Sequence, residues 1–240
     1  MSAAADSLRV RPGEAGTPET AGAGRASAGE VAEAARIIAG AGLVEGFGHV
    51  SARDRDGILI TATRPLGAAG AADIHRLDAS GAASVQATDV PLEAPMHAAV
   101  YAARPDVNAI CRTHSPAAVI AGAHGEVPPL GHGLGGLAGE VRPCGRTDLV
   151  TDREGGEQVA AALGPADCLL IRGNGAIATG SSLAEAVVRA YYLEERCLVG
   201  EALGPDQGFS EQELAARRRW FEQETARAWA WMHWRFGRDS

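Results

Sequence analysis

The sequence predicts an α/β fold: one three-layer αβα domain around a central mixed, largely antiparallel sheet. Segments with the periodicity of amphipathic helices alternate along the chain with short apolar segments typical of strands. Two pairs of these strand segments are separated by tight turns, Asp56-Gly57 and Gly173-Asn174-Gly175, which favour antiparallel hairpins. The length of 240 residues and the hydrophobic content of 46% suffice for one buried core.

The first half of the chain opens with a segment that is expected to lie outside the fold. Residues 1–26 carry hardly any large apolar side chain, so we expect a flexible N-terminal arm followed by a single domain over residues 27–240. A capping box from Ser27 to Glu30 opens a helix that runs to about Ala41. The next expected elements are strands at His49 to Arg53, at Ile58 to Ala62 and near Leu77, a helix at Pro95 to Ala103 and a strand at Asn108 to Thr113.

The second half begins with a helix opened by Ser115-Pro116. Gly125 to Arg146 is rich in Gly and Pro and predicts loops around short extended pieces. The spacing of Gly131, Gly133 and Gly136 matches a dinucleotide-binding pattern, but no strand precedes it and no helix pattern follows, so we reject that function. The remaining expected elements are a helix at Asp152 to Leu163, strands at Cys168 to Ile171 and Ala176 to Thr179, a helix from Ser182 to about Leu203, and a last helix from Ser210 toward Trp234.

Composition excludes several classes of function. A net charge of −8 argues against nucleic acid, and no apolar run approaches the roughly 18 residues of a membrane span. Four scattered cysteines without a C-x-x-C pair favour reduced thiols and a cytoplasmic protein. The sequence contains no lysine, which excludes Schiff-base chemistry, a pyridoxal phosphate anchor and a P-loop.

Arg112 and His114 are the first candidates for chemistry. Residues two apart on a strand share a face, so both side chains project from the end of the strand into one pocket. Taken alone, His114 could equally cap the next helix, and Glu93 could be a solvated carboxylate at a helix start. Asn174 alone is typical of a hairpin turn.

Three motifs occur in order along the chain. They are Gly46-Phe-Gly-His49-Val50-Ser51-Ala-Arg53, the segment Glu93-x-x-x-His97-x-x-x-Tyr101-x-x-Arg104-Pro105-Asp106 that leads on to Thr113-His114-Ser115, and Leu169-Leu170-Ile171-Arg172-Gly173-Asn174-Gly175 followed by Ser182-Leu-x-Glu-Ala-Val. Together they resemble the class II aldolase/adducin family over about residues 30–205. Within the family, the stretches Arg-Gly-x-Gly-Ala and Ala-Val-x-Arg-Ala-x-Tyr resemble the branch that includes hydroxyaromatic-acid decarboxylases.

The resemblance implies a class II aldolase-like homotetramer with active sites between neighbouring subunits. It also implies a divalent metal, held by a His-x-His pair and a hairpin histidine, and a glutamate that transfers protons. Here Arg112 and Asn174 stand at two of the three ligand positions, His114 is the only one retained, and Glu93 keeps the glutamate position. Since about three protein ligands are needed and a guanidinium repels a cation, we expect no metal and no other cofactor. The alternative is a divalent ion, Zn, Fe, Mn or Ni, bound through His114.

The residues that bind phosphate in the sugar-phosphate members are missing, because Thr61-Ala-Thr63-Arg64 and Pro91-Leu92 replace them. We therefore expect a small unphosphorylated carboxylate as the substrate, bound by Arg64 and Arg112. The predicted catalytic residues are Glu93, Arg112, His114 and His132, the last of which matches a loop histidine of the decarboxylase-like branch, and the predicted substrate-binding residues are Arg64, His49, Ser51 and Asn174.

The sequence thus favours a metal-independent carbon–carbon lyase, by decarboxylation or aldol-type cleavage, in which the charge of Arg112 takes the place of the metal. Two alternatives remain: a non-catalytic adducin-like interaction protein, and a metal-dependent lyase with unusual ligands. The four tryptophans of the C-terminal aromatic helix either pack against the domain or a neighbouring subunit, or form a lid over an aromatic substrate.

Overall fold

The computed structural model describes residues 26–55, 57–83, 87–204 and 207–237, so all but one residue of the expected N-terminal arm lies outside the described part. The helices are α1 (Ala28–Gly40), α2 (Ala94–Ala103), α3 (Pro116–His124), α4 (Arg153–Leu163), α5 (Leu183–Ala202), α6 (Glu211–Arg218) and α7 (Phe221–Phe236), with short 3-10 turns η1 (Leu66–Ala68), η2 (Ala71–Asp73) and η3 (Gly133–Ala138). The strands are β1 (His49–Arg53), β2 (Gly57–Thr61), β3 (Ile74–Asp78), β4 (Ala109–Thr113), β5 (Val141–Cys144), β6 (Cys168–Ile171) and β7 (Ala176–Gly180).

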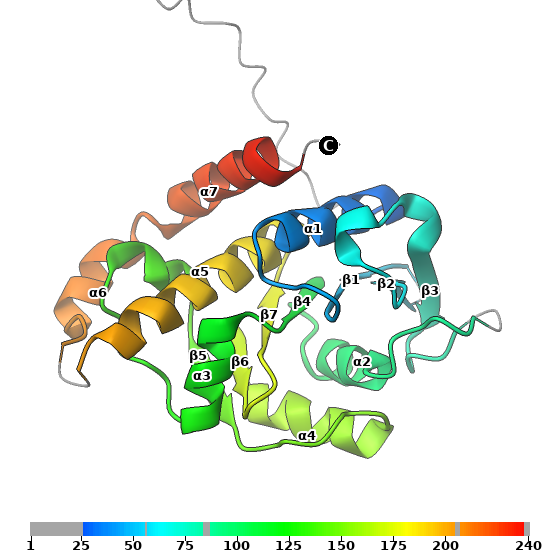
Figure 1. Cartoon of the computed structure of the whole chain (residues 1–240), viewed down its shortest axis with the longest axis horizontal. Helices are drawn as coiled ribbons and strands as arrows, with labels where there is room; N and C mark the ends of the chain where they lie inside the picture. The colour runs from blue at the N-terminus through cyan, green and yellow to red at the C-terminus, as the bar shows by residue number, and fades with distance from the viewer. Residues whose placement is uncertain (1–25, 56, 84–86, 205–206, 238–240) are drawn as a thin grey trace, which may run out of the picture.

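The seven strands form one sheet in the order β3-β2-β1-β4-β7-β6-β5, shown in Figure 1. Neighbouring strands are antiparallel except for β5 and β6, which are parallel. Because α4 connects β5 to β6, the chain crosses over before it returns to the sheet, as a parallel pair requires. The predicted α/β architecture with a mixed, largely antiparallel sheet is confirmed.

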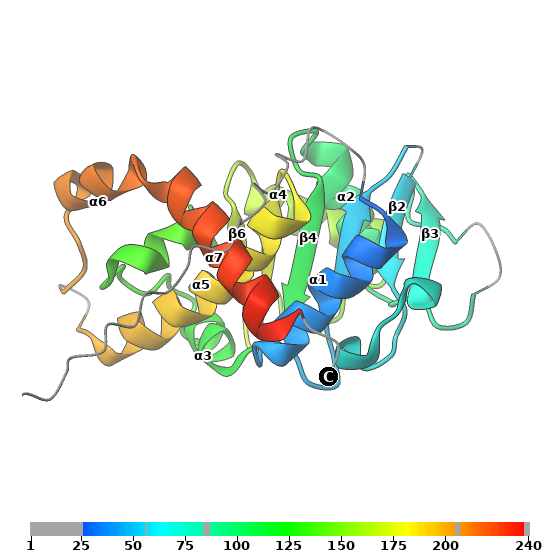
Figure 2. The ribbon, with the colours of Figure 1, turned by 90° about the horizontal axis from the view of Figure 1, so that it is seen from above.

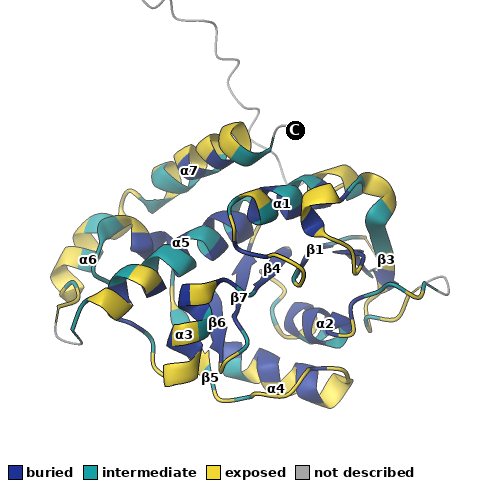
Figure 3. Ribbon diagram, viewed as in Figure 1, coloured by how far each residue is buried: buried dark blue, intermediate teal, exposed yellow. Residues whose placement is uncertain are grey.

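Two helical layers cover the sheet, and each has its own apolar core (Figures 1 and 3). Val50 and Ala52 of β1 and Cys111 of β4 point to the side of α1, α3 and α5. Ile110 of β4 and Ile177 of β7 point to the opposite side, where α2 and α4 lie. Alternate residues of a strand thus enter different cores. The odd-numbered residues of β1 and the even-numbered residues of β4 therefore face α2.

The C-terminal helix differs from the prediction. One helix was expected from Ser210 toward Trp234, but the chain turns at Arg219 and Trp220 and forms two, α6 and α7. The turn brings α7 back over α1 and α5, as Figure 2 shows, where Ala228 and Met232 are buried. A straight helix would carry these apolar side chains away from the core, so tertiary burial outweighs local helix propensity.

The same arrangement separates α7 from the residues proposed above for chemistry. Trp229 packs partly buried against the α1 and α5 core, and Trp231 contacts Tyr191 edge-on. The helix α7 lies on the face of the sheet opposite α2, where Trp229 packs against its own domain while Trp231 and Trp234 stay 39% and 57% exposed. They form no lid over the α2 face within one chain.

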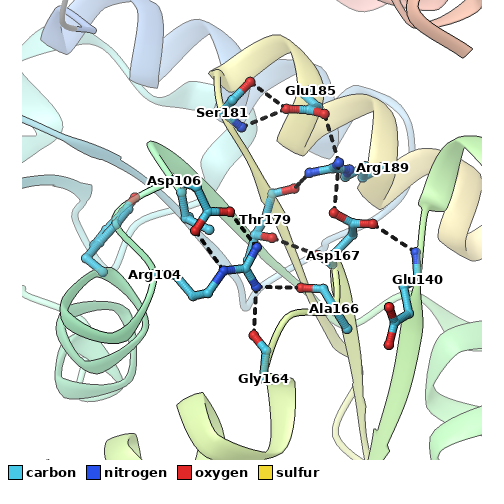
Figure 4. Close-up of polar contacts among 12 residues, drawn as sticks. Arg104, Asp106, Glu140, Gly164, Ala166, Asp167, Thr179, Ser181, Glu185 and Arg189 are labelled. Carbon is cyan, nitrogen blue, oxygen red and sulfur yellow. Dashed lines mark hydrogen bonds and ion pairs between the residues drawn. The ribbon is translucent and has the colours of Figure 1, made fainter.

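A network of arginine contacts lies at the end of the strands where β4 and β6 begin (Figure 4). Arg104 donates hydrogen bonds to the carbonyl oxygens of Gly164 and Ala166 and pairs with Asp106. Arg189 pairs with Asp167 at 2.8 Å, immediately before β6. These contacts join the end of α2 and the start of α5 to the loop that leads into β6. The described helices include none that is long and apolar enough to cross a membrane.

Candidate active site

The candidate site is built where β1, β4 and the start of α2 meet. His49 of β1 lies directly opposite Arg112 of β4 in the sheet register. Both side chains face the α2 layer, and Glu93 sits at the N-cap of α2. The backbone of Gly48 has a φ of 135° and comes so close to Arg112 that an added Cβ would lie 2.9 Å from its carbonyl oxygen. A glycine is therefore required for the two strands to approach at this point.

Arg112 is fully buried and most of its donors have partners. Nε donates to Oε2 of Glu93 at 3.2 Å, and Nη1 donates to the carbonyl oxygens of Thr113 and Asn174 at 2.8 and 2.7 Å. Burial lowers the pKa of Arg112, and the charge of Glu93 opposes this shift. Nη2 finds no partner among the described residues. The guanidinium is thus held by three hydrogen bonds, and its Nη2 amino group, with two N–H donors, is buried without a described partner.

The β6–β7 hairpin supplies one of the carbonyl oxygens that bind Arg112. Gly173 and Gly175 both have positive φ angles, 65° and 73°, which shape the turn around Asn174. A Cβ on Gly175 would come within 2.1 Å of the carbonyl oxygen of Thr113. The glycines therefore let the turn approach the end of β4, where the carbonyl group of Asn174 meets Arg112.

Glu93 is buried beside two partners. Besides Arg112, Nε2 of His49 lies 3.3 Å from Oε2. Burial raises the pKa of Glu93, but the hydrogen bond with His49 and the charge of Arg112 outweigh it and lower the pKa to about 2. Glu93 is thus ionised at neutral pH. Its second oxygen, Oε1, is buried without a hydrogen-bond partner in the described structure.

His114 follows β4 and is half-buried at the same end of the sheet. Burial and then the charge of Arg112 lower the pKa of His114 to about 4, so its imidazole is neutral at pH 7. The side chain of Asn174 is close enough to oppose this shift of the pKa, and Nδ1 of His114 has no partner among the residues described. The structure therefore brings four of the eight predicted site residues together: Glu93, Arg112, His114 and Asn174.

His49 and Ser51 also reach this region, but they lie behind the carboxylate. Nδ1 of His49 is 2.6 Å from Nε2 of His97, and Nδ1 of His97 is 2.7 Å from Oγ of Ser51. Ser51 is 0% exposed and its hydroxyl also bonds with that of Tyr101 at 2.8 Å. In contrast to the prediction that Ser51 binds substrate, its hydroxyl is occupied within the core.

His97 and Tyr101 were not predicted as functional residues. The available signal was their spacing, because Glu93, His97 and Tyr101 follow one another at intervals of four and share one face of α2.

The other two predicted residues lie farther out. Arg64 follows β2 near the same end of the sheet, is exposed, and pairs with Asp89 at 3.4 Å and Asp73 at 3.6 Å. His132 precedes η3, which packs against α5 and α6. No described hydrogen bond or ion pair joins His132 to Glu93, Arg112 or His114.

The donor groups do not fit the divalent metal that the family resemblance implies. A fixed guanidinium stands at one ligand position and is paired with Glu93. The main-chain oxygen of Asn174 is already bound to that guanidinium. Nowhere in the described ranges do three or more His, Cys, Asp or Glu side chains gather in a group that could hold a metal ion. These groups therefore do not form a divalent-metal site of the kind that the resemblance implies.

Comparison with known proteins agrees with the motifs. The model of the class II aldolase and adducin N-terminal domain matches residues 29–199. The chain belongs to the class II aldolase and adducin family. Two similar family proteins are the 3,4-dihydroxyphthalate decarboxylases of Terrabacter sp. (strain DBF63) and Rhodococcus jostii (strain RHA1), at 34% and 31% identity. The matches cover 68% and 69% of this chain and 75% of each relative. This agrees with the branch that the motifs indicated.

The chain is also similar to proteins with other names. The 5-methylthioribulose-1-phosphate/5-deoxyribulose-1-phosphate aldolase of Rhodospirillum rubrum is 33% identical over 69% of this chain and 79% of its own. In fold, the chain resembles an aldolase II superfamily protein from Pseudomonas syringae, with a TM-score of 0.72, 22% identity, and coverage of 85% of this chain and 89% of that one. At the family level, the decarboxylases and the aldolase support a lyase enzyme.

Proposed function

We propose that the protein is a metal-independent decarboxylase of a small, unphosphorylated hydroxyaromatic carboxylate. The observation that carries this proposal is the pair of unpartnered atoms on adjacent groups, Nη2 of Arg112 and Oε1 of Glu93. One is a donor with a fixed positive charge and the other is an acceptor. A substrate hydroxyl can donate to Oε1, while its oxygen, or the neighbouring carboxylate, accepts from Nη2.

This pairing suits a phenol whose carboxylate is next to the hydroxyl. Oε1 of Glu93 accepts the phenolic proton, and Arg112 stabilises the phenolate. Glu93 returns the proton to the ring carbon that bears the carboxylate. The bond to the carboxylate then breaks, CO₂ leaves with the electron pair returning to the phenolate oxygen, and a proton from solvent restores the hydroxyl. One proton is consumed for each CO₂ released.

The charges of the site favour the first half of this transfer, in which Glu93 accepts the proton. A substrate carboxylate beside Glu93 raises the pKa of Glu93 in the complex, because like charges disfavour ionisation, and this makes it a better proton acceptor. His114, neutral and close to Arg112, is placed to accept or donate a hydrogen bond through its free Nδ1. We assign His114 to orienting the substrate and Glu93 to proton transfer.

The surroundings support an aromatic and unphosphorylated ligand. Phe47, two residues before His49, is 80% exposed, and Leu92, next to Glu93, is 68% exposed. These exposed apolar side chains suit a ring better than a sugar. Arg64, the other candidate for anion binding, is shared between two aspartates, which neutralise it and weaken it as a phosphate site.

We also propose that the enzyme is a homotetramer and that His132 serves the site of a neighbouring subunit. Its separation from Glu93 within one chain supports this. Mixing inactive Glu93→Gln subunits with inactive His132→Ala subunits is expected to restore activity in mixed oligomers. If His132→Ala is inactive and mixing restores nothing, the assignment of His132 fails.

The proposed reaction is tested with purified protein and a panel of ortho-hydroxylated benzene carboxylates. The panel includes 3,4-dihydroxyphthalate, the compound in the names of the two decarboxylases. We expect CO₂ release and incorporation of one solvent deuterium at the vacated ring carbon. Arg112→Met and Glu93→Gln should abolish both. If no member of the panel releases CO₂, the proposed function is wrong.

Aldol-type cleavage is the second candidate, and the identity of 33% to an aldolase favours it. A fixed guanidinium stabilises an enolate less strongly than a divalent cation does, so an unactivated aldol is a harder substrate for this site. Release of a carbonyl product from a short-chain aldol, in place of CO₂ from the panel, would select this reaction.

A further inference from the structure

A continuous row of buried polar side chains leads away from Glu93 between β1 and α2. The order along the row is Glu93, His49, His97, Ser51 and Tyr101, joined by distances of 3.3, 2.6, 2.7 and 2.8 Å. Its members come alternately from the helix and the strand. All five are buried, His97 and Ser51 completely.

Matching repeat distances make this row possible. Two residues along a strand advance about 6.6 Å, and four residues along a helix advance about 6.0 Å. His49 and Ser51 are two apart on the face of β1 that points to α2, and Glu93, His97 and Tyr101 are four apart on α2. The side chains therefore interleave, and each polar atom meets one on the other element.

The row ends at a fixed point. Arg53, the next residue of β1 on the same face, lies with its guanidinium carbon 4.9 Å from the centre of the Tyr101 ring. It also donates to the main-chain oxygens of Tyr101, Arg104 and Val107 at the end of α2. Tyr101 is thus held by a cation that itself caps the helix.

Only one arrangement of protons satisfies the whole row when Glu93 is ionised and both imidazoles are neutral. Oε2 of Glu93 can only accept, so Nε2 of His49 carries the proton. Nδ1 of His49 must then accept from Nε2–H of His97, and Nδ1 of His97 accepts from the hydroxyl of Ser51. Ser51 in turn accepts from Tyr101. All the donors therefore point toward Glu93.

The charged groups around the row favour this state. Burial lowers the pKa of His49, with a further contribution from the charge of Arg112, and it lowers the pKa of His97 well below its usual value. Burial also raises the pKa of Tyr101. Both imidazoles and the phenol are therefore neutral at pH 7, and Glu93 is ionised.

We propose that His97 is a positioning residue for Glu93: by donating from Nε2, it holds His49 in the tautomer that donates to Oε2 and so leaves Oε1 free for the substrate. This inference rests on the proposed function in one respect, that Glu93 carries the proton. Without the donor from His97, His49 can place its proton on Nδ1, and an unprotonated Nε2 would then face the carboxylate. Glu93 would lose a donor and its orientation.

The test uses the full chain with ¹⁵N-labelled histidine rings, whose chemical shifts report which ring nitrogen carries the proton. The signals of His49 are identified by their absence in His49→Gln. In the wild-type protein, we expect His49 protonated at Nε2. In His97→Leu, we expect a mixture of both tautomers. In His97→Gln, whose amide retains a donor near the place of Nε2, we expect the wild-type tautomer.

Two further variants serve as matched controls. Tyr101→Phe leaves Ser51 able to donate to His97, so the tautomer of His49 should not change. Ser51→Ala removes the donor to Nδ1 of His97, so His49 should again show both tautomers. If His97→Leu does not fold, Ser51→Ala alone tests whether the row fixes the tautomer of His49. A wild-type protein with His49 protonated at Nδ1, or a leucine or alanine variant with the tautomer unchanged, would overturn the proposal.

Turnover gives the second readout. We expect kcat of His97→Leu to fall about tenfold or more with KM within about twofold, and His97→Gln to recover most of the rate, since only the orientation of Glu93 is lost. An unchanged kcat in His97→Leu refutes the positioning role. If the wild-type protein releases no CO₂ from any substrate offered, the proposed function fails, while the tautomer measurement still decides the role of His97.

Discussion

Arg112 and Glu93 form a buried ion pair in which each member keeps one polar atom free of protein partners in the described part of the chain. Removing water from two charges costs free energy, and the attraction between them offsets this cost only while both are present. The pair is therefore a weak source of stability but a strong constraint on geometry. In the proposed function, these two buried atoms are the ones that the substrate contacts.

Separate and joint replacement of the pair tests this constraint. Arg112→Met and Glu93→Gln should each lower the free energy of unfolding by about 3–5 kcal/mol, because each leaves a buried charge alone. The double variant should cost less than the sum of the two, by roughly 1–3 kcal/mol. Chemical denaturation of the four proteins measures the coupling, and strictly additive costs would contradict it.

A matched control comes from the opposite end of the sheet. Arg104→Lys removes the guanidinium group that hydrogen-bonds both to Asp106 and to the carbonyl oxygens of Gly164 and Ala166. We expect a loss of about 1–2 kcal/mol of stability with kcat unchanged, since Arg104 does not reach the site. A loss of kcat comparable to that in Arg112→Met would show that general destabilisation explains both.

Acid should destabilise the fold before its carboxylates titrate. Burial lowers the pKa values of His49, His97 and His114, that of His114 to about 4. Between the unfolded pKa of 6.5 and these values, the unfolded chain binds protons that the folded chain does not, so stability falls as the pH falls from about 6.5 toward 4. Below pH 4.5, the unfolded chain binds a proton at Glu93, whereas the folded chain, in which the pKa of Glu93 is about 2, does not. This difference extends the loss of stability toward lower pH.

Thermal melting between pH 7.5 and 4 measures this slope. His97→Gln should make it shallower, because one imidazole no longer differs between the folded and unfolded states. A melting temperature independent of pH between 6.5 and 5 would show that the folded and unfolded chains bind equal numbers of protons in this range, so that burial does not lower the pKa of these imidazoles.

Gly173 and Gly175 of the β6–β7 hairpin allow the cost of a positive φ angle to be measured separately from the cost of a steric clash. Gly173→Ala should cost about 1–2 kcal/mol, the usual penalty for a side chain at positive φ, because an added Cβ meets nothing within 4 Å. Gly175→Ala has the same penalty and also clashes with Thr113, so it should cost more and reduce kcat by displacing the carbonyl that holds Arg112. Equal effects of the two variants, measured by denaturation and turnover, would exclude a special role for Gly175.

Removal of metal should leave the enzyme active. After dialysis against a chelator, turnover of the proposed hydroxyaromatic substrate should stay within about twofold of the untreated rate, because the charge of Arg112 is covalently part of the chain. Elemental analysis for zinc, iron, manganese and nickel should find none in stoichiometric amount. Loss of activity that returns when one of these ions is added would favour the metal-dependent alternative.

Much of the fold could be predicted because local signals and tertiary packing agree. The capping box at Ser27, the turn at Gly173 and Gly175 and the strand β4 that ends at Thr113 appear in the structure where the sequence predicts them. The break at Trp220 could not be predicted, since Arg219, Trp220 and Phe221 do not themselves interrupt a helix. Only the burial of residues farther along α7 favours it.

The candidate site shows the same division. The motifs placed Glu93, Arg112 and His114 together. The position of the Arg112 guanidinium, however, depends on hydrogen bonds to main-chain oxygens, which cannot be predicted from a pattern of side chains. His97 resembles an ordinary core histidine when its own segment is considered alone. Its contacts become visible only when the spacing on α2 is compared with that on a strand more than 40 residues earlier.

The interleaving of β1 and α2 makes these two segments sensitive to changes of length in a particular way. One residue inserted within α2 between Glu93 and Tyr101 would rotate everything after it by about 100°, and one residue inserted in β1 would turn His49 or Ser51 to the opposite face. Either change would break several hydrogen bonds at once and leave their polar groups buried. A substitution in these segments can therefore remove a single hydrogen bond, whereas an insertion would disrupt the whole row from Glu93 to Tyr101 at once.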